Sequence, residues 1–152
     1  MGTIEKAPGL SGIVQHLFIK PRHGAPMRPV QRATAITSTG LQEDVNCGKR
    51  KRQLLLIEAE TLRDFALEPG DVRENIVISG LPLAGTKPGT RLHAGPVELE
   101  VTNDCAPCEY MNSLRPGLQR DIEGRRGTLC RVVNGGFINV GDTVGFMNRP
   151  IE

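Results

Sequence analysis

The sequence predicts a mainly β fold, a closed or nearly closed β-barrel of about eight or nine short strands with two or more short helices. The 152 residues include 18 glycines and 11 prolines, which are spread along the chain, as is typical of short strands joined by turns. Apolar and polar residues alternate over residues 97–102, which is the period of a half-buried strand. The triplet Asn134-Gly135-Gly136 is a strong hairpin signal between two further apolar runs.

Each expected strand is a short run bounded by turn residues. The first is apolar at several positions on both faces, as in the wall of a barrel. Two later strands form a hairpin through Gly95-Pro96. In chain order, the expected strands cover residues 12–20, 30–36, 53–57, 76–79, 91–94, 97–102, 128–133, 137–140 and 143–147.

Three segments have helical character. Apolar residues at helical spacing predict a short amphipathic helix over residues 59–67. Residues 109–114 predict a helical turn that stops before Pro116, and residues 117–124 predict a further short helix.

Length and composition narrow the class of protein. A chain of 152 residues is the size of one domain, which we place at residues 12–147, with tails at residues 1–11 and 148–152. Aromatic residues are 3% of the chain and the net charge is +2, which counts against nucleic acid as a partner. No apolar run is long enough to span a membrane, and no secretory signal is recognisable. We therefore expect a cytoplasmic protein without a membrane partner, whose cysteines are free or bound to a metal.

The pair Cys105 and Cys108 is the strongest chemical signal. It lies between an expected strand and an expected helical turn, where unpaired backbone N–H groups favour the thiolate form of Cys108. Asp104 and Glu109 oppose this effect with their negative charge. We expect a reactive thiol at Cys108.

Two basic stretches accompany the cysteines. Residues 49–52 read KRKR and lead directly into a buried strand, so they are either a solvated loop or a cradle for an anion. Arg73 and Asn75 precede another strand and offer a planar fork and an amide, although an ordinary polar loop would look the same. Arg125 and Arg126 form a basic turn in the sequence GRRG.

The sequence resembles the MOSC domain, the C-terminal module of eukaryotic molybdenum cofactor sulfurases, which also occurs alone in bacteria. Four stretches carry the resemblance in the family's order: KRKRQLLLI, RENIVISG, CAPC and GGFINVGDTV. The resemblance covers residues 12–147. It implies a barrel-like fold and a cysteine that either ligates the molybdenum of the molybdenum–molybdopterin cofactor or carries sulfur as a persulfide.

The resemblance also implies roles for individual residues. Cys108 matches the cysteine that ligates molybdenum in relatives and is the implied catalytic thiolate. The residues themselves leave two interpretations of Cys105: it is either a resolving thiol, which would form a disulfide with Cys108, or a small buried residue. The anion cradle would be Arg73 with one or more of Arg50, Arg52, Arg125 and Arg126. The resemblance implies Arg52, Gln53, Arg73 and Asn75 as cofactor-binding residues, and the basic turn adds Arg125 and Arg126 as candidates for the phosphate.

The chain departs from its larger relatives in ways that leave its activity open. The N-terminal lobe of the amidoxime reducers and the pyridoxal-phosphate-dependent domain of the full sulfurases are both missing, so no pyridoxal phosphate site is expected. The activity could be sulfur transfer or molybdenum-dependent reduction of N-hydroxylated compounds. An electron-transfer protein or a sulfur donor would be a partner, a molybdoenzyme could be the sulfur acceptor, and a homodimer could complete the pocket.

Two other functions compete with this reading. Cys105 and Cys108 have the spacing of half a structural zinc site. The other half is lacking, because Cys47 and Cys130 are isolated and the three histidines form no paired motif. Cys47 is instead expected to be a free thiol and Cys130 a core thiol. The other alternative is a non-enzymatic barrel that binds anions or RNA through the KRKR and GRRG loops. The three histidines are His16, His23 and His93.

Overall fold

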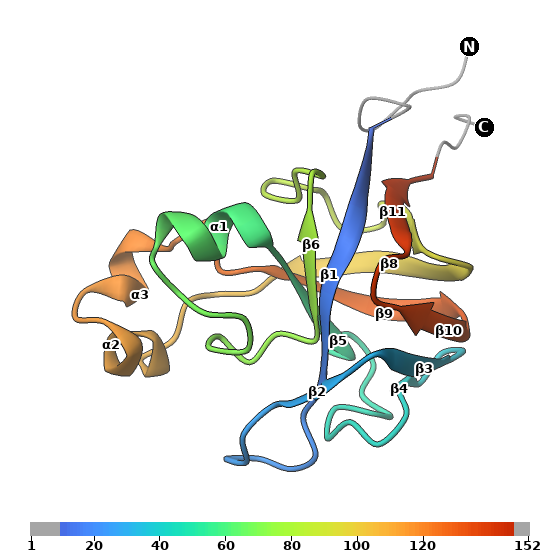
Figure 1. Cartoon of the computed structure of the whole chain (residues 1–152), viewed down its shortest axis with the longest axis horizontal. Coiled ribbons are helices and arrows are strands. Elements are labelled where there is room, and N and C mark those ends of the chain that lie inside the picture. Colours follow the sequence, from blue (N-terminus) through green and yellow to red (C-terminus); the bar gives the residue numbers. More distant parts are fainter. Residues whose placement is uncertain (1–9, 148–152) are drawn as a thin grey trace.

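The computed structural model describes residues 10–147, in which short strands and three short helices alternate (Figure 1). The helices are α1 (Ala59–Asp64), α2 (Tyr110–Leu114) and α3 (Leu118–Asp121). The strands are β1 (Ser11–Ile19), β2 (Arg28–Val30), β3 (Arg32–Ile36), β4 (Gly40–Leu41), β5 (Leu54–Glu58), β6 (Ile76–Ser79), β7 (Arg91–Ala94), β8 (Val97–Asp104), β9 (Thr128–Asn134), β10 (Gly136–Asn139) and β11 (Thr143–Phe146).

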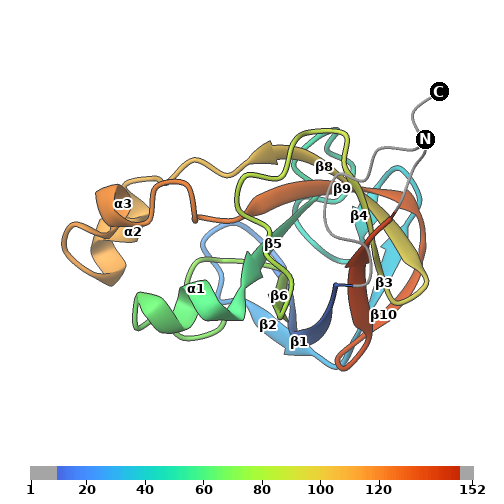
Figure 2. The ribbon, with the colours of Figure 1, turned by 90° about the horizontal axis from the view of Figure 1, so that it is seen from above.

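Seven strands close into a barrel. Their order is β1-β11-β7-β8-β9-β5-β6, and β6 pairs again with β1. β2 adds to the free end of β1, and β10-β3-β4 form a separate small sheet. Among these pairings only β5 with β6 is parallel, because α1 provides the crossover between them. Figure 2 shows the helices gathered to one side of the barrel.

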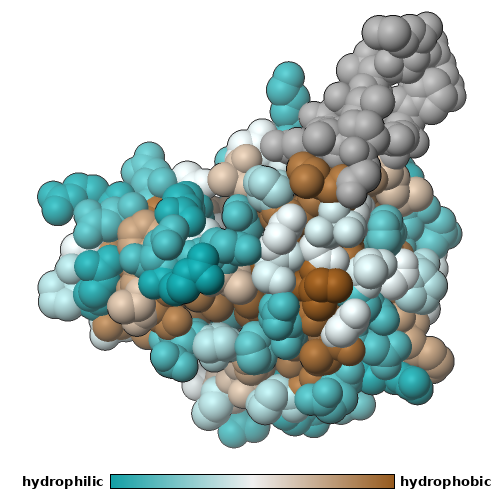
Figure 3. All heavy atoms as spheres, turned by 45° about the horizontal axis from the view of Figure 1, so that its top comes forward, coloured by the Kyte–Doolittle hydropathy of each residue, from teal (hydrophilic) through white to brown (hydrophobic). Residues whose placement is uncertain are grey.

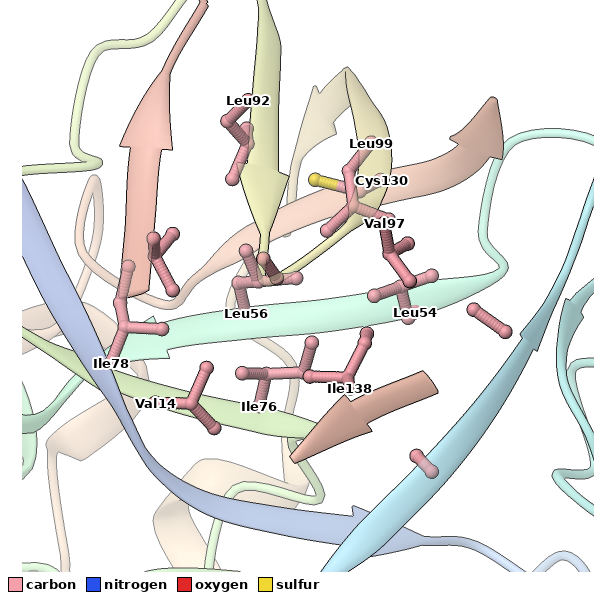
Figure 4. Close-up of a cluster of buried hydrophobic side chains, with 14 of the residues drawn as sticks. Val14, Leu54, Leu56, Ile76, Ile78, Leu92, Val97, Leu99, Cys130 and Ile138 are labelled. Carbon is pink, nitrogen blue, oxygen red and sulfur yellow. The ribbon is translucent and has the colours of Figure 1, made fainter. Parts of the chain in front are cut away.

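The barrel interior is filled by aliphatic side chains from its strands. Leu54 and Leu56 of β5 point inward and meet residues of β1, β6, β7, β8 and β9 (Figure 4). Ile57 belongs instead to a second apolar cluster, which packs under the three helices. β5 is therefore apolar at successive positions because protein covers both of its faces.

The predicted fold class is confirmed. All nine expected strand regions contain strand, and the three expected helical segments contain helix. The region 30–36 differs in that a bend at Gln31 divides it, so that β2 pairs with β1 while β3 joins β10. β4 was not predicted, since it is two residues long within a polar turn. The predicted tails lie mostly outside the described residues, and β1 begins at Ser11.

Hydrophilic side chains cover much of the helical side of the molecule, while a narrow hydrophobic band runs over the barrel (Figure 3). None of the helices in residues 10–147 has the length and apolar character needed to cross a membrane.

Candidate functional site

A cavity of about 270 Å³ opens where the ends of five neighbouring barrel strands meet. Residues that follow β1 and β8, and residues that precede or begin β5, β6 and β9, contribute to its wall. These strands are consecutive in the barrel, in the order β8-β9-β5-β6-β1. The lining residues are Lys20, His23, Asn46, Lys49, Arg52, Leu54, Leu55, Arg73, Asn75, Cys105, Cys108, Tyr110, Arg126 and Leu129.

The cavity is strongly cationic. Its lining, as far as residues 10–147 form it, holds basic side chains from four separate segments and no aspartate or glutamate. Burial lowers the pKa of Lys20, and the positive charge of Arg73 lowers it further. Such mutual repulsion among cations is relieved when an anion binds. The basic lining residues are Lys20, His23, Lys49, Arg52, Arg73 and Arg126.

Arg126 is the most unusual of these basic residues. Only 6% of the residue is exposed, and its Nε and Nη1 atoms have no hydrogen-bond partner among the described residues. A buried charged donor without a partner is costly unless a ligand pairs with it. Arg126 therefore has the properties of an anion-binding group.

Arg73 is held in a strained position. Its φ is +64°, a backbone conformation that side chains larger than glycine rarely adopt and that is found preferentially at functional sites. Its guanidinium carbon lies 4.2 Å from the centre of the Tyr110 ring, a cation–π contact. The Tyr110 hydroxyl donates a hydrogen bond to the Asp71 carbonyl at 3.1 Å, which fixes the ring on which Arg73 rests.

The two cysteines line the cavity in different ways. Cys108 is exposed and precedes α2, and its carbonyl accepts a hydrogen bond from the Met111 N–H at 2.9 Å. Cys105 is 7% exposed and packs with Leu55 and Leu129 on the apolar part of the wall. Both thiols are free. The structure thus places an accessible thiol and a buried thiol in the same cationic cavity.

Asn75 lines the cavity, but its side-chain amide is hydrogen-bonded to other residues of the protein. Its Oδ1 accepts a hydrogen bond from the Leu55 N–H at 3.0 Å. Its Nδ2 donates to the Phe18 carbonyl at 3.1 Å and to Asp44 Oδ1 at 3.0 Å. These bonds tie β1, β5 and the loop around Asp44 together at the cavity wall.

Gln53 is bonded in a similar way, away from this cavity. Its Nε2 donates to the Ser38 and Lys49 carbonyls, and its Oε1 accepts from the Val132 N–H at 2.8 Å. It lines a separate hollow of about 520 Å³, together with Arg50. The predicted pair Arg52 and Gln53 is therefore divided between two cavities.

Arg125 also lies outside the cavity. Its Nη2 donates to Asp64 Oδ2 at 2.9 Å and to Thr61 Oγ1 at 3.1 Å, which attaches the basic turn to α1. Since Arg126 is buried and Arg125 is paired, the GRRG turn does not present two unpaired arginines to an RNA backbone.

Glu74 lies between the two predicted residues Arg73 and Asn75 and was not predicted to be important. It is fully buried, and its Oε2 accepts a hydrogen bond from the Gly70 N–H at 2.6 Å. Burial raises its pKa from 4.5 to about 7, while the Gly70 hydrogen bond and the charge of Arg126 act in the opposite direction.

Sequence reasoning also missed several lining residues. Lys20 and His23 come from the segment after β1, and Tyr110 is the only tyrosine in the chain. The basic sequence around His23 is a signal for part of this group, but the contribution of Lys20 depends on strand order, which the sequence does not reveal. The other lining residues that were not predicted as site residues include Asn46, Leu54, Leu55 and Leu129.

The other cysteines lie elsewhere. Cys130 is fully buried in the barrel core (Figure 4), where burial raises the pKa of its thiol, so its prediction as a core thiol is confirmed. Cys47 is a half-buried free thiol. Within residues 10–147, no three His, Cys, Asp or Glu side chains are grouped so that they could hold a metal ion.

Comparisons with known proteins agree with the fold. A family model described as the MOSC domain matches residues 20–145. The crystal structure of the YuaD protein from Bacillus subtilis is 18% identical, with a TM-score of 0.77 over 89% of this chain and 94% of that chain. The structure of YiiM from Geobacillus stearothermophilus is 16% identical, with a TM-score of 0.72 over 91% of this chain and 76% of that chain.

YiiM from Escherichia coli is also similar, at 18% identity and a TM-score of 0.64 over 91% of this chain and 72% of that chain. A comparison with curated proteins found no match.

Proposed function

The chain belongs to the MOSC domain family, and from this premise we propose that it binds the molybdenum–molybdopterin cofactor at the cationic cavity. In this proposal Cys108 is the working thiolate, which either ligates molybdenum or carries a sulfur atom as a persulfide. The observation that supports it most strongly is that the accessible Cys108 thiol and the buried, unpartnered Arg126 guanidinium line one cavity.

The residues present fit such a group. A phosphate needs charged donors, and Arg126 offers two nitrogen atoms without a partner, while Arg52 and Arg73 line the same wall. The metal of the cofactor would need a ligand from the protein, and the exposed Cys108 offers a sulfur atom for this role. The zinc alternative lacks this support, because no group of three metal-ligating side chains lies within residues 10–147.

Each side chain has a distinct task in the proposed site. Arg126 pairs with the phosphate, and Arg73 holds the anion from the side on which Tyr110 fixes it. Asn75 keeps the wall in shape through its bonds to Phe18 and Leu55. When bound, the cofactor supplies a redox-active metal. When Cys108 acts as a carrier, its thiolate attacks the outer sulfur of a donor persulfide, a new S–S bond forms on Cys108, and the donor leaves as a thiolate.

The cavity is too small to enclose a whole cofactor, which supports the participation of a partner chain. A volume of about 270 Å³ is just below the usual range for small-molecule sites, roughly 300–1,000 Å³. We therefore propose that a partner chain covers the rest of the cofactor, either a sulfur donor, an electron-transfer protein, a molybdoenzyme that accepts sulfur, or a second copy of this chain.

The test is to purify the protein from a host that makes molybdenum cofactor and to measure molybdenum per chain together with the intact mass. We expect bound molybdopterin, or the added mass of one sulfur atom on Cys108, and in either case loss of the signal in Cys108→Ser. Cys47→Ser is the matched control, since Cys47 is a free thiol outside the cavity, and it should retain the signal. If the wild-type protein shows neither bound molybdopterin nor an added sulfur atom, the proposed function is wrong.

A further inference from the structure

Cys105 and Cys108 are placed as a dithiol in which one sulfur is presented to solvent and the other is held back. Cys108 is exposed, Cys105 is 7% exposed, and both are free and line the same cavity. Two residues separate them, and residues 105–108 belong to neither a helix nor a strand. A change in the backbone of this segment would therefore break no strand pairing or helix.

The buried thiol is anchored more firmly than the exposed one. The Cys105 N–H donates to the Gly127 carbonyl at 2.9 Å, and its side chain packs against Leu55 and Leu129. Solvent and bulky partners can thus reach Cys108 first, whereas Cys105 can be reached from within the cavity. This is the arrangement of an attacking thiol and a resolving thiol.

We propose that Cys105 is the resolving thiol that discharges sulfur from Cys108. The inference rests on the proposed role of Cys108 as a persulfide carrier. Cys105 loses its proton and attacks the inner sulfur of the Cys108 persulfide. A disulfide between Cys105 and Cys108 forms, the bond between the two persulfide sulfurs breaks, and the outer sulfur leaves as hydrosulfide, which takes up a proton. The carried sulfur is reduced to sulfide, and the two cysteine thiols are oxidised.

The surroundings favour this step. Both the attacking thiolate and the departing hydrosulfide are anions, and the cavity wall holds Arg52, Arg73 and Arg126 but no carboxylate. The disulfide is returned to two thiols by an external dithiol reductant, which completes the cycle. The chain would then release its sulfur as sulfide without a separate acceptor protein.

The experiment uses the full chain and inorganic polysulfide as the sulfur source. The reduced protein is treated with polysulfide and desalted, and then sulfide release and intact mass are followed without added thiol. The wild type should first gain one sulfur atom and then release sulfide as it reaches the mass of the disulfide form. In Cys105→Ala the added sulfur should stay on Cys108, and release should slow by roughly tenfold or more, because an intramolecular thiol acts at an effective concentration in the millimolar range.

Alanine is chosen because Cys105 lies in an apolar cluster that a serine hydroxyl would disturb, and gain of sulfur on Cys108 in this variant shows that the site is intact. Cys47→Ala should behave as the wild type. Equal release from the wild type and Cys105→Ala would overturn the inference.

A second measurement separates this inference from the carrier role. Oxidation of the reduced protein with diamide should link Cys105 to Cys108, as seen by peptide mapping. If the link forms but Cys108 never gains sulfur, the carrier role fails while the dithiol pairing stands. If no link forms, the resolving role of Cys105 is wrong.

Discussion

Arg125 and Arg126 are adjacent in the sequence but have different structural roles. Arg125 points to α1 and is paired with Asp64, whereas Arg126 is buried with two nitrogen atoms unpartnered. The first is an ordinary surface ion pair, and such pairs contribute little to stability. The second is a buried charge with two donor nitrogen atoms that no described residue satisfies, and an anionic ligand would offset the cost of this burial.

This contrast makes a matched test. In Arg126→Met at pH 5, where Glu74 is protonated, the free energy of unfolding of the ligand-free protein should be unchanged or raised by about 1 kcal/mol, because a buried charge without a hydrogen-bond partner on two of its nitrogen atoms is removed. Its affinity for inorganic pyrophosphate, measured by calorimetry, should fall by roughly tenfold or more. Arg125→Met should lower stability by about 0.5 kcal/mol and leave the affinity unchanged. Equal effects of the two changes on pyrophosphate binding would contradict the role given to Arg126.

Glu74 gives the protein a pH-dependent stability. Burial raises its pKa from 4.5 to about 7, so between these values the folded chain holds a proton that the unfolded chain has released. Because the folded state binds more protons in this range, stability falls as the pH rises from 4.5 to about 7 and then levels off.

The variant Glu74→Gln should remove this dependence, since a glutamine amide oxygen can still accept the hydrogen bond from the Gly70 N–H and does not titrate. The variant should therefore be more stable than the wild type at high pH. The difference between their free energies of unfolding should grow by about 3 kcal/mol as the pH rises from 4.5 to about 7. Urea unfolding at a series of pH values measures it, and a difference that stays constant with pH would show that Glu74 is not the titrating group.

At the scale of single residues, the sequence predicted the chemistry of the site better than the role of each side chain. Cys108, Arg73 and Arg126 were named from their residue types and positions, and the structure brings them to one cavity. Asn75 and Gln53 were named as cofactor contacts, but their amides are bonded within the protein. A sequence shows that an amide is present, whereas its partners depend on the packing of distant strands.

At the scale of the secondary-structure elements, the cationic cavity forms where the five adjacent strands β8, β9, β5, β6 and β1 end or begin. Gly127 lies at this junction, directly before β9, with φ of +133°. A Cβ atom on this residue would lie 2.9 Å from the Leu56 carbonyl oxygen and 2.8 Å from Leu55 Cδ1. Its own carbonyl accepts the hydrogen bond from Cys105, so this close approach of β9 to β5 also positions the cysteine loop.

Alanine at this position should therefore be costly. Gly127→Ala should lower the free energy of unfolding by about 2 kcal/mol more than Gly124→Ala, and should increase the alkylation rate of Cys105. Gly124 is the matched control, because it also has a positive φ but has open space where a Cβ would lie. Thermal or urea unfolding of both variants measures the difference, and equal losses of stability would contradict the proposed steric role.

Elements were predicted where the local pattern was strong. The alternation in β8 was evident in the sequence, and the strand exists. The hairpin expected at Asn134-Gly135-Gly136 is wrong: this triplet does separate β9 from β10, but β9 pairs with β5 and β8 while β10 pairs with β3 in the other sheet. The separation of β2 from β3 could not be foreseen, because it follows from pairing with different partners, β1 and β10. Strand order in a barrel is set by contacts between residues far apart in the chain, which a pattern of single residues does not contain.

At the scale of the whole molecule, the charge is unevenly distributed. The net charge is only +2, which suggested no strong electrostatic preference, yet six basic side chains line one cavity without an acidic neighbour in its wall. Closure of the barrel causes this concentration, because it brings segments around residues 20, 50, 73 and 126 to one end. Total composition could not reveal it.

The resemblance noted from four stretches of sequence was correct at the level of the family and fold. The cofactor, the direction of sulfur or electron transfer and the partner remain predictions, because they depend on molecules that recognise this cavity rather than on the chain alone.

The most direct measurement is the rate at which a small alkylating reagent modifies Cys108, with and without inorganic pyrophosphate at constant ionic strength. If the thiol and the basic groups share one anion-binding cavity, pyrophosphate should slow the modification of Cys108 in a saturable way, leave Cys47 unaffected and have no effect in Arg126→Met. If Cys108 is modified at the same rate at every pyrophosphate concentration, the thiol and the anion site are separate.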